Sequence, residues 1–123
     1  MRKMALVADD DLQLLDAVAA GLEEVGMEVQ RATNGAELVQ RLAQNGAYDV
    51  VVTDISMPWT SGLQAVRRAR SAGLTMPVVL MTALRDEQLL PQVAALGENV
   101  VLLRKPFGLD ALLATVTSLL AKR

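Results

Sequence analysis

Five short aliphatic runs alternate along this chain with longer segments of helical periodicity, and this alternation restricts the folds open to it. The strand candidates are 4–8, 27–32, 49–54, 77–82 and 99–103, and the helix candidates are 11–25, 35–45, 61–72, 87–96 and 109–121. Five successive βα units predict an α/β fold with one doubly wound, five-stranded parallel sheet and five helices. Because 123 residues suffice for one domain with a core but not for two, we expect residues 1–123 to form a single domain.

The composition of each run indicates its place in the sheet. Four runs are almost continuously apolar, which is typical of strands covered by helices on both faces. The run at 27–32 is more mixed and therefore suits a sheet edge. Glycine often ends helices, and the first four helix candidates are followed by Gly26, Gly46, Gly73 and Gly97.

Pro91 falls inside the fourth helix candidate, 87–96. Proline is tolerated in the first turn of a helix but costs about 3 kcal/mol in its interior. We therefore expect this helix to begin late, near Leu89 or Leu90, or to have an irregular first turn. The fourth helix is therefore predicted to be short and mobile, and full protection from hydrogen exchange from Asp86 onward would contradict this prediction.

The composition excludes several kinds of site. The chain contains no cysteine and no histidine, so disulfides, zinc sites and histidine bases are absent and any metal must be held by oxygen. With a net charge of −2, its most basic stretch holds Arg67, Arg68 and Arg70, interpreted as a solvated helix face, so we expect no nucleic-acid binding. No segment has the apolar length of a membrane span or a signal peptide, and we expect a cytoplasmic location without membrane contact.

Polar side chains stand where the predicted strands end. Asp9 and Asp10 follow the first strand, Asp54 ends the third, Thr82 ends the fourth, and Arg104 and Lys105 follow the fifth. The carboxyl ends of parallel strands meet at one edge of the sheet, so these groups should converge there. Close carboxylates raise each other's pKa unless a cation neutralises them, and Mg²⁺ prefers carboxylate oxygens. The cluster therefore predicts a Mg²⁺ site.

Asp54 ends the central strand of the predicted site, and a carboxylate can attack phosphorus to form an aspartyl phosphate. Thr82 could donate a hydrogen bond to the phosphoryl oxygens, and Lys105 could supply a positive charge. The residues therefore predict phosphoryl chemistry at Asp54.

The segments LVADDD, DVVVTDISMPWTSG, PVVLMTA and LLRKPF occur in this order over essentially the whole chain. Together they resemble the receiver domain of bacterial two-component response regulators, which has a flavodoxin-like (βα)5 fold. The resemblance implies that Asp54 accepts a phosphoryl group from the phosphohistidine of a sensor histidine kinase or a histidine phosphotransfer protein. It also implies a signalling domain that catalyses only its own phosphorylation and dephosphorylation.

By the same resemblance, Asp9, Asp10 and Asp54 bind Mg²⁺ together with the backbone carbonyl of Ser56. Thr82 matches the hydroxyl that turns toward the phosphoryl group, and Lys105 its ion partner. The resemblance further implies a cis bond between Lys105 and Pro106. Phosphorylation would switch the surface around the fourth helix, fifth strand and fifth helix toward a downstream effector domain or protein; a phosphorylation-dependent homodimer is left open.

Other interpretations stay open for the function and for single residues. An aspartyl-nucleophile phosphohydrolase usually carries a second acid two residues after its nucleophile, where this chain has Ser56. A domain that only binds partners, without phosphorylation, would not require the full set of polar residues at the ends of the strands. We expect Asp11 to cap the first helix rather than to bind metal. Gly62 is interpreted as a residue that only frees the backbone for a turn.

Two positions depart from the family pattern. The residue three places before Lys105 is usually aromatic in members that signal through a rotating ring, and here it is Leu102. Trp59 stands in the loop after Asp54, where small residues are more usual. An exposed tryptophan there would mark a contact surface, and one packed over the loop would not.

Overall fold

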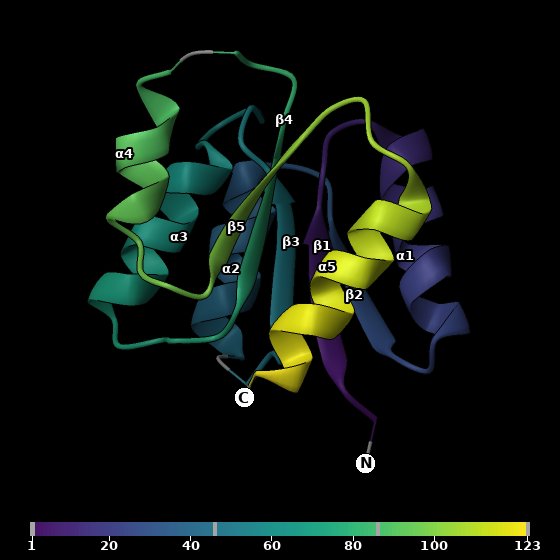
Figure 1. Ribbon diagram of the computed structural model, residues 1–123. Coiled ribbons are helices and arrows are strands. Elements are labelled where there is room, and N and C mark those ends of the chain that lie inside the picture. The colour runs from purple at the N-terminus through teal and green to yellow at the C-terminus, as the bar shows by residue number, and fades with distance from the viewer. Residues whose placement is uncertain (1, 46, 86, 123) are drawn as a thin grey trace.

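The computed structural model describes residues 2–45, 47–85 and 87–122, which form one sheet with helices on both faces (Figure 1). The strands are β1 Met4–Ala8, β2 Glu28–Ala32, β3 Val50–Asp54, β4 Val78–Thr82 and β5 Val100–Arg104. The helices are α1 Leu12–Glu24, α2 Gly35–Gln44, α3 Gly62–Ser71, α4 Leu89–Ala94 and α5 Leu109–Ala121. The predicted α/β fold and its ten elements are confirmed, with most boundaries within one residue of the prediction.

All strand pairs are parallel, and their order across the sheet is β2-β1-β3-β4-β5. The predicted edge position of β2 is therefore confirmed. The strand order reverses between β1 and β3, which is where doubly wound folds place their functional sites. The fifth strand was expected to be covered on both faces, but β5 is the other edge and all five of its residues are only half-buried.

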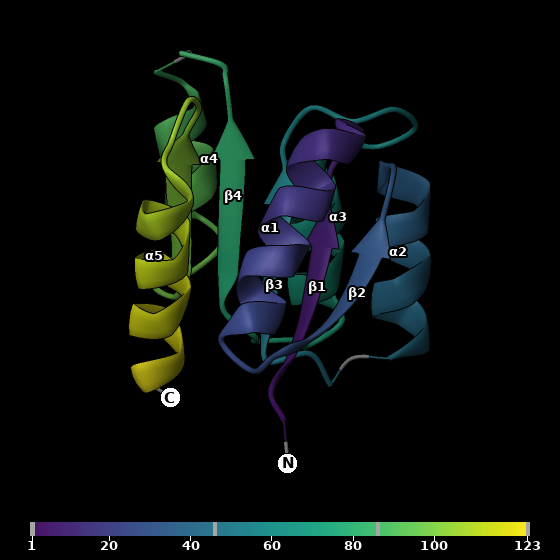
Figure 2. The same cartoon turned by 90° about the vertical axis from the view of Figure 1, so that its right-hand side faces the viewer.

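Two hydrophobic cores lie on opposite faces of the sheet, because successive strand residues point to opposite faces. Leu6 belongs to the core under α2, α3 and α4, and its neighbour Val7 belongs to the core under α1 and α5. Figure 2 looks onto the second of these faces, with α1 and α5 in front of the strands. The sheet edge between the two cores is left for polar side chains.

The helix ends follow the glycine pattern. Gly26, Gly73 and Gly97 have φ angles of 92°, 89° and 114°, in the left-handed region that glycine adopts without strain. The corresponding prediction for Gly46 lies outside the described residues. None of the helices in the described ranges has both the length and the apolar character needed to cross a bilayer.

Helix α4 is short, as Pro91 predicted. It begins at Leu89, so the proline occupies its first turn, and no side chain caps its N-terminus. Asp86 lies outside the described residues. The mobility of this helix stays a prediction.

The arginine-rich stretch of α3 does not form one solvated face. Arg67 and Arg68 are exposed, but Arg70 is half-buried. Its guanidinium donates hydrogen bonds of 2.8–3.1 Å to the backbone carbonyls of three residues and to a side-chain oxygen: Leu74, Met76 and Leu96, and Oδ1 of Asn99. The interpretation of Arg70 as a solvated residue was therefore wrong, because the loops after α3 and α4 turn their carbonyls toward it.

Candidate functional site

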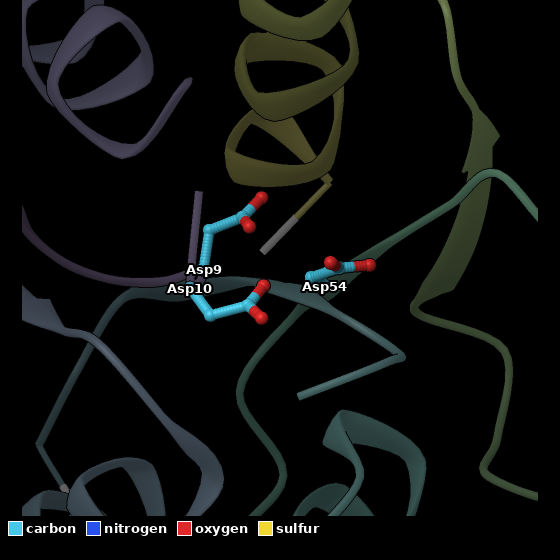
Figure 3. A group of neighbouring side chains, drawn as sticks. All are labelled: Asp9, Asp10 and Asp54. Carbon is cyan, nitrogen blue, oxygen red and sulfur yellow. The ribbon is translucent and has the colours of Figure 1, made fainter. Parts of the chain in front are cut away.

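Three aspartates meet at the carboxyl edge of the sheet. Asp9 follows β1 and Asp54 ends β3, and these strands are neighbours with Ala8 paired to Thr53. One carboxylate oxygen from each of Asp9, Asp10 and Asp54 lies within 4.8 Å of the other two. Figure 3 shows the three side chains around a shared space at the ends of these strands. The expected convergence of these carboxylates is present in the structure.

The three aspartates differ in burial. Asp9 is completely buried and Asp54 is only 7% exposed, whereas Asp10 is exposed. Oδ1 of Asp9 accepts a 2.9 Å hydrogen bond from the backbone N–H of Asp11. Nζ of Lys105 lies 3.3 Å from Oδ2 of Asp9 and 3.3 Å from Oδ2 of Asp54. A single ammonium therefore faces the two buried carboxylates.

The electrostatics of this group are unbalanced. Burial raises the pKa of Asp54, the negative charge of Asp9 raises it further, and Lys105 opposes both effects only in part. Burial acts to lower the pKa of Lys105, but the charges of Asp54 and Asp9 outweigh it, and the pKa of Lys105 is raised. A further cation beside the carboxylates would relieve this excess of negative charge.

The donor set matches a hard divalent metal ion. Its atoms are carboxylate oxygens, and Mg²⁺ takes oxygen ligands from one or two carboxylates while it keeps several waters. The exposed side of the cluster at Asp10 leaves room for such waters. The acidic group could therefore hold a metal ion.

Thr82 lies beside the site, at the end of β4, and is almost completely buried. Its Oγ1 accepts a 2.9 Å hydrogen bond from the backbone N–H of Leu84. The carbonyl of Leu84 accepts a 2.9 Å hydrogen bond from Nη1 of Arg104, which is directed to this loop rather than to the carboxylates. The loop after β4 is thus held from both sides.

Asp11 caps α1, as predicted. Its Oδ1 accepts hydrogen bonds of 3.1 and 3.2 Å from the backbone N–H groups of Gln13 and Leu14. The third aspartate of the run therefore serves the first helix, and the group of carboxylates that could hold a metal does not include it.

The loop between β3 and α3 is held by close backbone contacts at two glycines. A Cβ atom on Gly62 would lie 2.1 Å from the carbonyl oxygen of Asp54, and one on Gly35 would lie 1.9 Å from that of Thr60. The N–H of Gly62 also donates to the carbonyl of Ile55 at 2.9 Å. The interpretation of Gly62 as a residue that only frees the backbone for a turn was wrong. The backbone of Asp54 comes so close to Gly62 that no side chain fits there. Sequence reasoning missed Gly35, because only the folded structure brings it to this loop.

The remaining predicted features lie close by. The peptide bond between Lys105 and Pro106 is cis, as expected. The backbone N–H of Ser56 lies 3.4 Å from Oδ1 of Asp54, and the role of its carbonyl stays a prediction. Leu102 pairs with Leu80 of β4 and packs, half-buried, on the core under α2, α3 and α4.

Curated proteins similar to this chain are response regulators. The chain is 41% identical over 115 residues to the response regulator protein PmrA of Pseudomonas aeruginosa, covering 93% of this chain and 51% of that protein. It is 38% identical over 117 residues to the probable transcriptional regulatory protein SilR of Salmonella typhimurium, covering 95% and 50%. The chain thus spans about half the length of the curated relatives it matches.

Solved structures of similar chains have the same fold. The receiver domain of the Francisella response regulator 1452 has a TM-score of 0.86 at 28% identity, over 98% of both chains. Chemotaxis protein CheY4 of Vibrio cholerae has a TM-score of 0.86 at 25% identity, over 97% of this chain and 99% of that one. The sequence pattern of the response regulator receiver domain matches residues 5–117. The chain therefore belongs to the receiver domain family of two-component response regulators.

Proposed function

We propose that Asp54 accepts a phosphoryl group from a phosphohistidine on a partner histidine kinase or phosphotransfer protein, in a Mg²⁺-dependent reaction. The observation that carries this proposal is the position of the Asp54 carboxylate, at the end of the central strand with Asp9 and Lys105 beside it. The chain has no histidine, so the donor imidazole must come from the partner. Residues 1–123 would form this one domain.

In the proposed transfer, a carboxylate oxygen of Asp54 attacks the phosphorus atom. The bond between phosphorus and the imidazole nitrogen breaks, and its electron pair stays on that nitrogen. Lys105 donates to a phosphoryl oxygen and offsets its charge. The hydroxyl of Thr82 accepts from Leu84, so its own hydrogen is free to donate to a second phosphoryl oxygen.

The residues proposed to hold Mg²⁺ are Asp9, Asp10 and Asp54, with the backbone carbonyl of Ser56. When bound, the ion supplies positive charge that offsets the repulsion between these carboxylates and the phosphoryl group. The fit rests on the oxygen-only donor set and on the excess of negative charge at Asp54.

The proposed output is a change of the surface around α4, β5 and α5 that a downstream effector domain or protein recognises. The domain would turn over no separate metabolite. Effector identity, homodimerisation and a cytoplasmic location stay predictions, since the chain spans only about half of its curated relatives.

Intact-mass measurement after incubation with phosphoramidate or acetyl phosphate and Mg²⁺ tests the proposal. We expect a single phosphoryl adduct that is absent without Mg²⁺ and absent in Asp54→Ala. Asp10→Ala should also lose Mg²⁺-dependent phosphorylation while keeping the fold. Asp11→Ala is the matched control, because it removes the same charge one residue away and should be phosphorylated normally. Trp59 fluorescence should respond to Mg²⁺ in the unmodified protein.

Two outcomes would contradict the proposal. An adduct that persists in Asp54→Ala would place the phosphoryl group elsewhere. Steady turnover of a phosphate ester without an accumulated adduct would instead identify a phosphohydrolase.

A further inference from the structure

The two helical layers carry opposite charge. Helices α2, α3 and α4, on one face of the sheet, contain four arginines and one glutamate. Helices α1 and α5, on the other face, contain four acidic residues and no basic residue. The helices of the α2–α3–α4 layer therefore carry a net positive charge, and those of the α1–α5 layer a net negative charge.

The exposed arginines of this layer line a surface depression. Arg67 and Arg68 lie on the outer side of α3 and, together with Thr60, Gln64 and Ser71, surround a volume of about 420 Å³. Neither arginine forms an ion pair within residues 2–45, 47–85 and 87–122, and Arg67 has a 3.5 Å contact with the amide oxygen of Gln92. Their charge is therefore available to a ligand, unlike that of Arg70.

The residue next to this depression, Trp59, has a conformation and an exposure that do not favour folding. Trp59 directly precedes Thr60, is 83% exposed as a residue, and has a φ angle of 78°. A left-handed conformation is strained for a bulky side chain, and an exposed indole buries little surface in return. Strain at an exposed aromatic residue points to a contribution to binding rather than to folding.

We propose that this depression and Trp59 form a docking surface for an acidic segment of a partner protein. Guanidinium groups bind carboxylates through two parallel hydrogen bonds, so Arg67 and Arg68 suit Asp and Glu side chains. Thr60, Gln64 and Ser71 add neutral hydrogen-bonding groups to the same depression, where the hydroxyl of Thr60 donates to Oε1 of Gln64 at 2.8 Å. Trp59 packs against an apolar side chain of the same segment.

An acidic peptide fits this surface better than a nucleic acid does. Strands of nucleic acid need a longer positive track and several aromatic platforms. Here two exposed arginines have no ion-pair partner among the described residues, and Trp59 is the exposed aromatic side chain, since Tyr48 is buried and Phe107 is half-buried. None of the three carboxylates lines the depression, so the proposal does not depend on phosphorylation of Asp54.

Fluorescence anisotropy with a labelled synthetic peptide tests the proposal. The probe is a peptide of Asp and Glu residues around one central leucine, compared with a lysine counterpart and with single-stranded DNA. We expect saturable binding of the acidic peptide with a Kd of about 1 mM or tighter at low salt. Arg67→Glu/Arg68→Glu should weaken it by about tenfold or more, and Trp59→Ala should weaken it measurably.

The matched control is Arg2→Glu/Lys3→Glu, which makes the same charge change at two exposed residues outside the depression. It should bind the peptide like the unmodified chain, and circular dichroism should show every variant folded. Asp54→Ala should also bind normally, even if phosphorylation fails. Equal weakening by both double variants, no saturable binding, or tighter arginine-dependent binding of DNA would each overturn the proposal. Self-association lost in Arg67→Glu/Arg68→Glu would also overturn it, because a second copy would then occupy the surface.

Discussion

The two helical layers are joined to the carboxylate site in different ways. The α1–α5 layer is joined through charged side chains. Asp11 caps α1 and its backbone N–H donates to Asp9, while Lys105, just before α5, lies 3.3 Å from both Asp9 and Asp54.

The α2–α3–α4 layer is joined through backbone contacts. Gly62 at the start of α3 leaves room for the carbonyl of Asp54, and Gly35 at the start of α2 leaves room for that of Thr60. Charged contacts respond to salt and pH, whereas steric contacts do not. One layer should therefore transmit changes of charge at the site, and the other should transmit displacements of its backbone.

Gly62→Ala should have the largest effect, because it places a methyl group 2.1 Å from the carbonyl oxygen of Asp54. We expect the free energy of unfolding to fall by about 3 kcal/mol, to a similar extent at low and high salt. Urea denaturation at two salt concentrations measures both quantities.

Gly108→Ala is the matched control, because no heavy atom beyond the glycine and its two chain neighbours lies within 4 Å of the Cβ position and its φ is −79°. It should change the free energy of unfolding by about 1 kcal/mol or less. If both variants lose the same stability, the close approach at Gly62 does not join α3 to the site.

Arg70→Ala should have the second largest effect. It tests an exception within the α2–α3–α4 layer, because Arg70 is a charged side chain that joins α3 to the loops around it. The side chain donates to three carbonyls and to Asn99, so its removal leaves partly buried acceptors without a partner. We expect a loss of about 2 kcal/mol in the free energy of unfolding.

The neighbouring exposed residue provides the control for that change. Arg68→Ala should alter the free energy of unfolding by about 0.5 kcal/mol or less. Equal losses in Arg70→Ala and Arg68→Ala would mean that the carbonyls around Arg70 are satisfied by water instead.

These cases show how far sequence reasoning reaches. The alternation of apolar runs with helical periodicity predicted every helix and strand, because strands that lie between two layers of helices must be apolar along their length. The convergence of Asp9, Asp54 and Lys105 followed from strand ends alone, since parallel strands share one edge. Their proposed roles in binding and catalysis are still to be tested.

Other features depend on contacts that periodicity does not encode. Helical spacing placed Arg70 beside Arg67 and Arg68, but it carries no information on where the carbonyls of distant loops lie. Gly35 and Gly62 were visible as glycines, and the reason for each is a distance to a backbone oxygen that exists only in the folded chain. The half-buried state of β5 depends on strand order, which the sequence pattern does not specify.

Asp11→Ala tests whether charged side chains join the α1–α5 layer to the carboxylate site. Loss of an N-cap removes the acceptor for two backbone N–H groups, and we expect about 1 kcal/mol less stability by urea denaturation. Asp11→Asn keeps an acceptor oxygen at the same position and should lose less. Equal losses in the two variants would show that charge near the helix end, rather than the hydrogen bonds, is what stabilises α1.

Substitution of Glu37 should change stability least, but it tests the contrast between the two layers most directly. Glu37 is a charged side chain that holds the start of α2, in the layer whose other contacts with the site are backbone contacts. Its carboxylate accepts hydrogen bonds from the backbone N–H and the hydroxyl of Thr33, and these bonds lower the pKa of Glu37 below its ordinary value of 4.5. A carboxyl group whose pKa is lowered by folding stabilises the protein above the ordinary value and loses that contribution as the pH falls through the lowered one. Because the side chain is only half-buried, solvent screens its charge, and the contribution of that charge should be a few tenths of a kcal/mol.

Urea denaturation of the unmodified chain and of Glu37→Gln, over a series of pH values, measures this contribution. Glutamine keeps an acceptor oxygen, so the stability difference reports the charge, and titration of Asp54 cancels because both proteins contain it. We expect a difference at pH 7 that shrinks as the pH falls below about 4.5. A difference that does not change with pH would mean that the charge of Glu37 does not stabilise α2. Close backbone contacts would then hold the whole of the α2–α3–α4 layer.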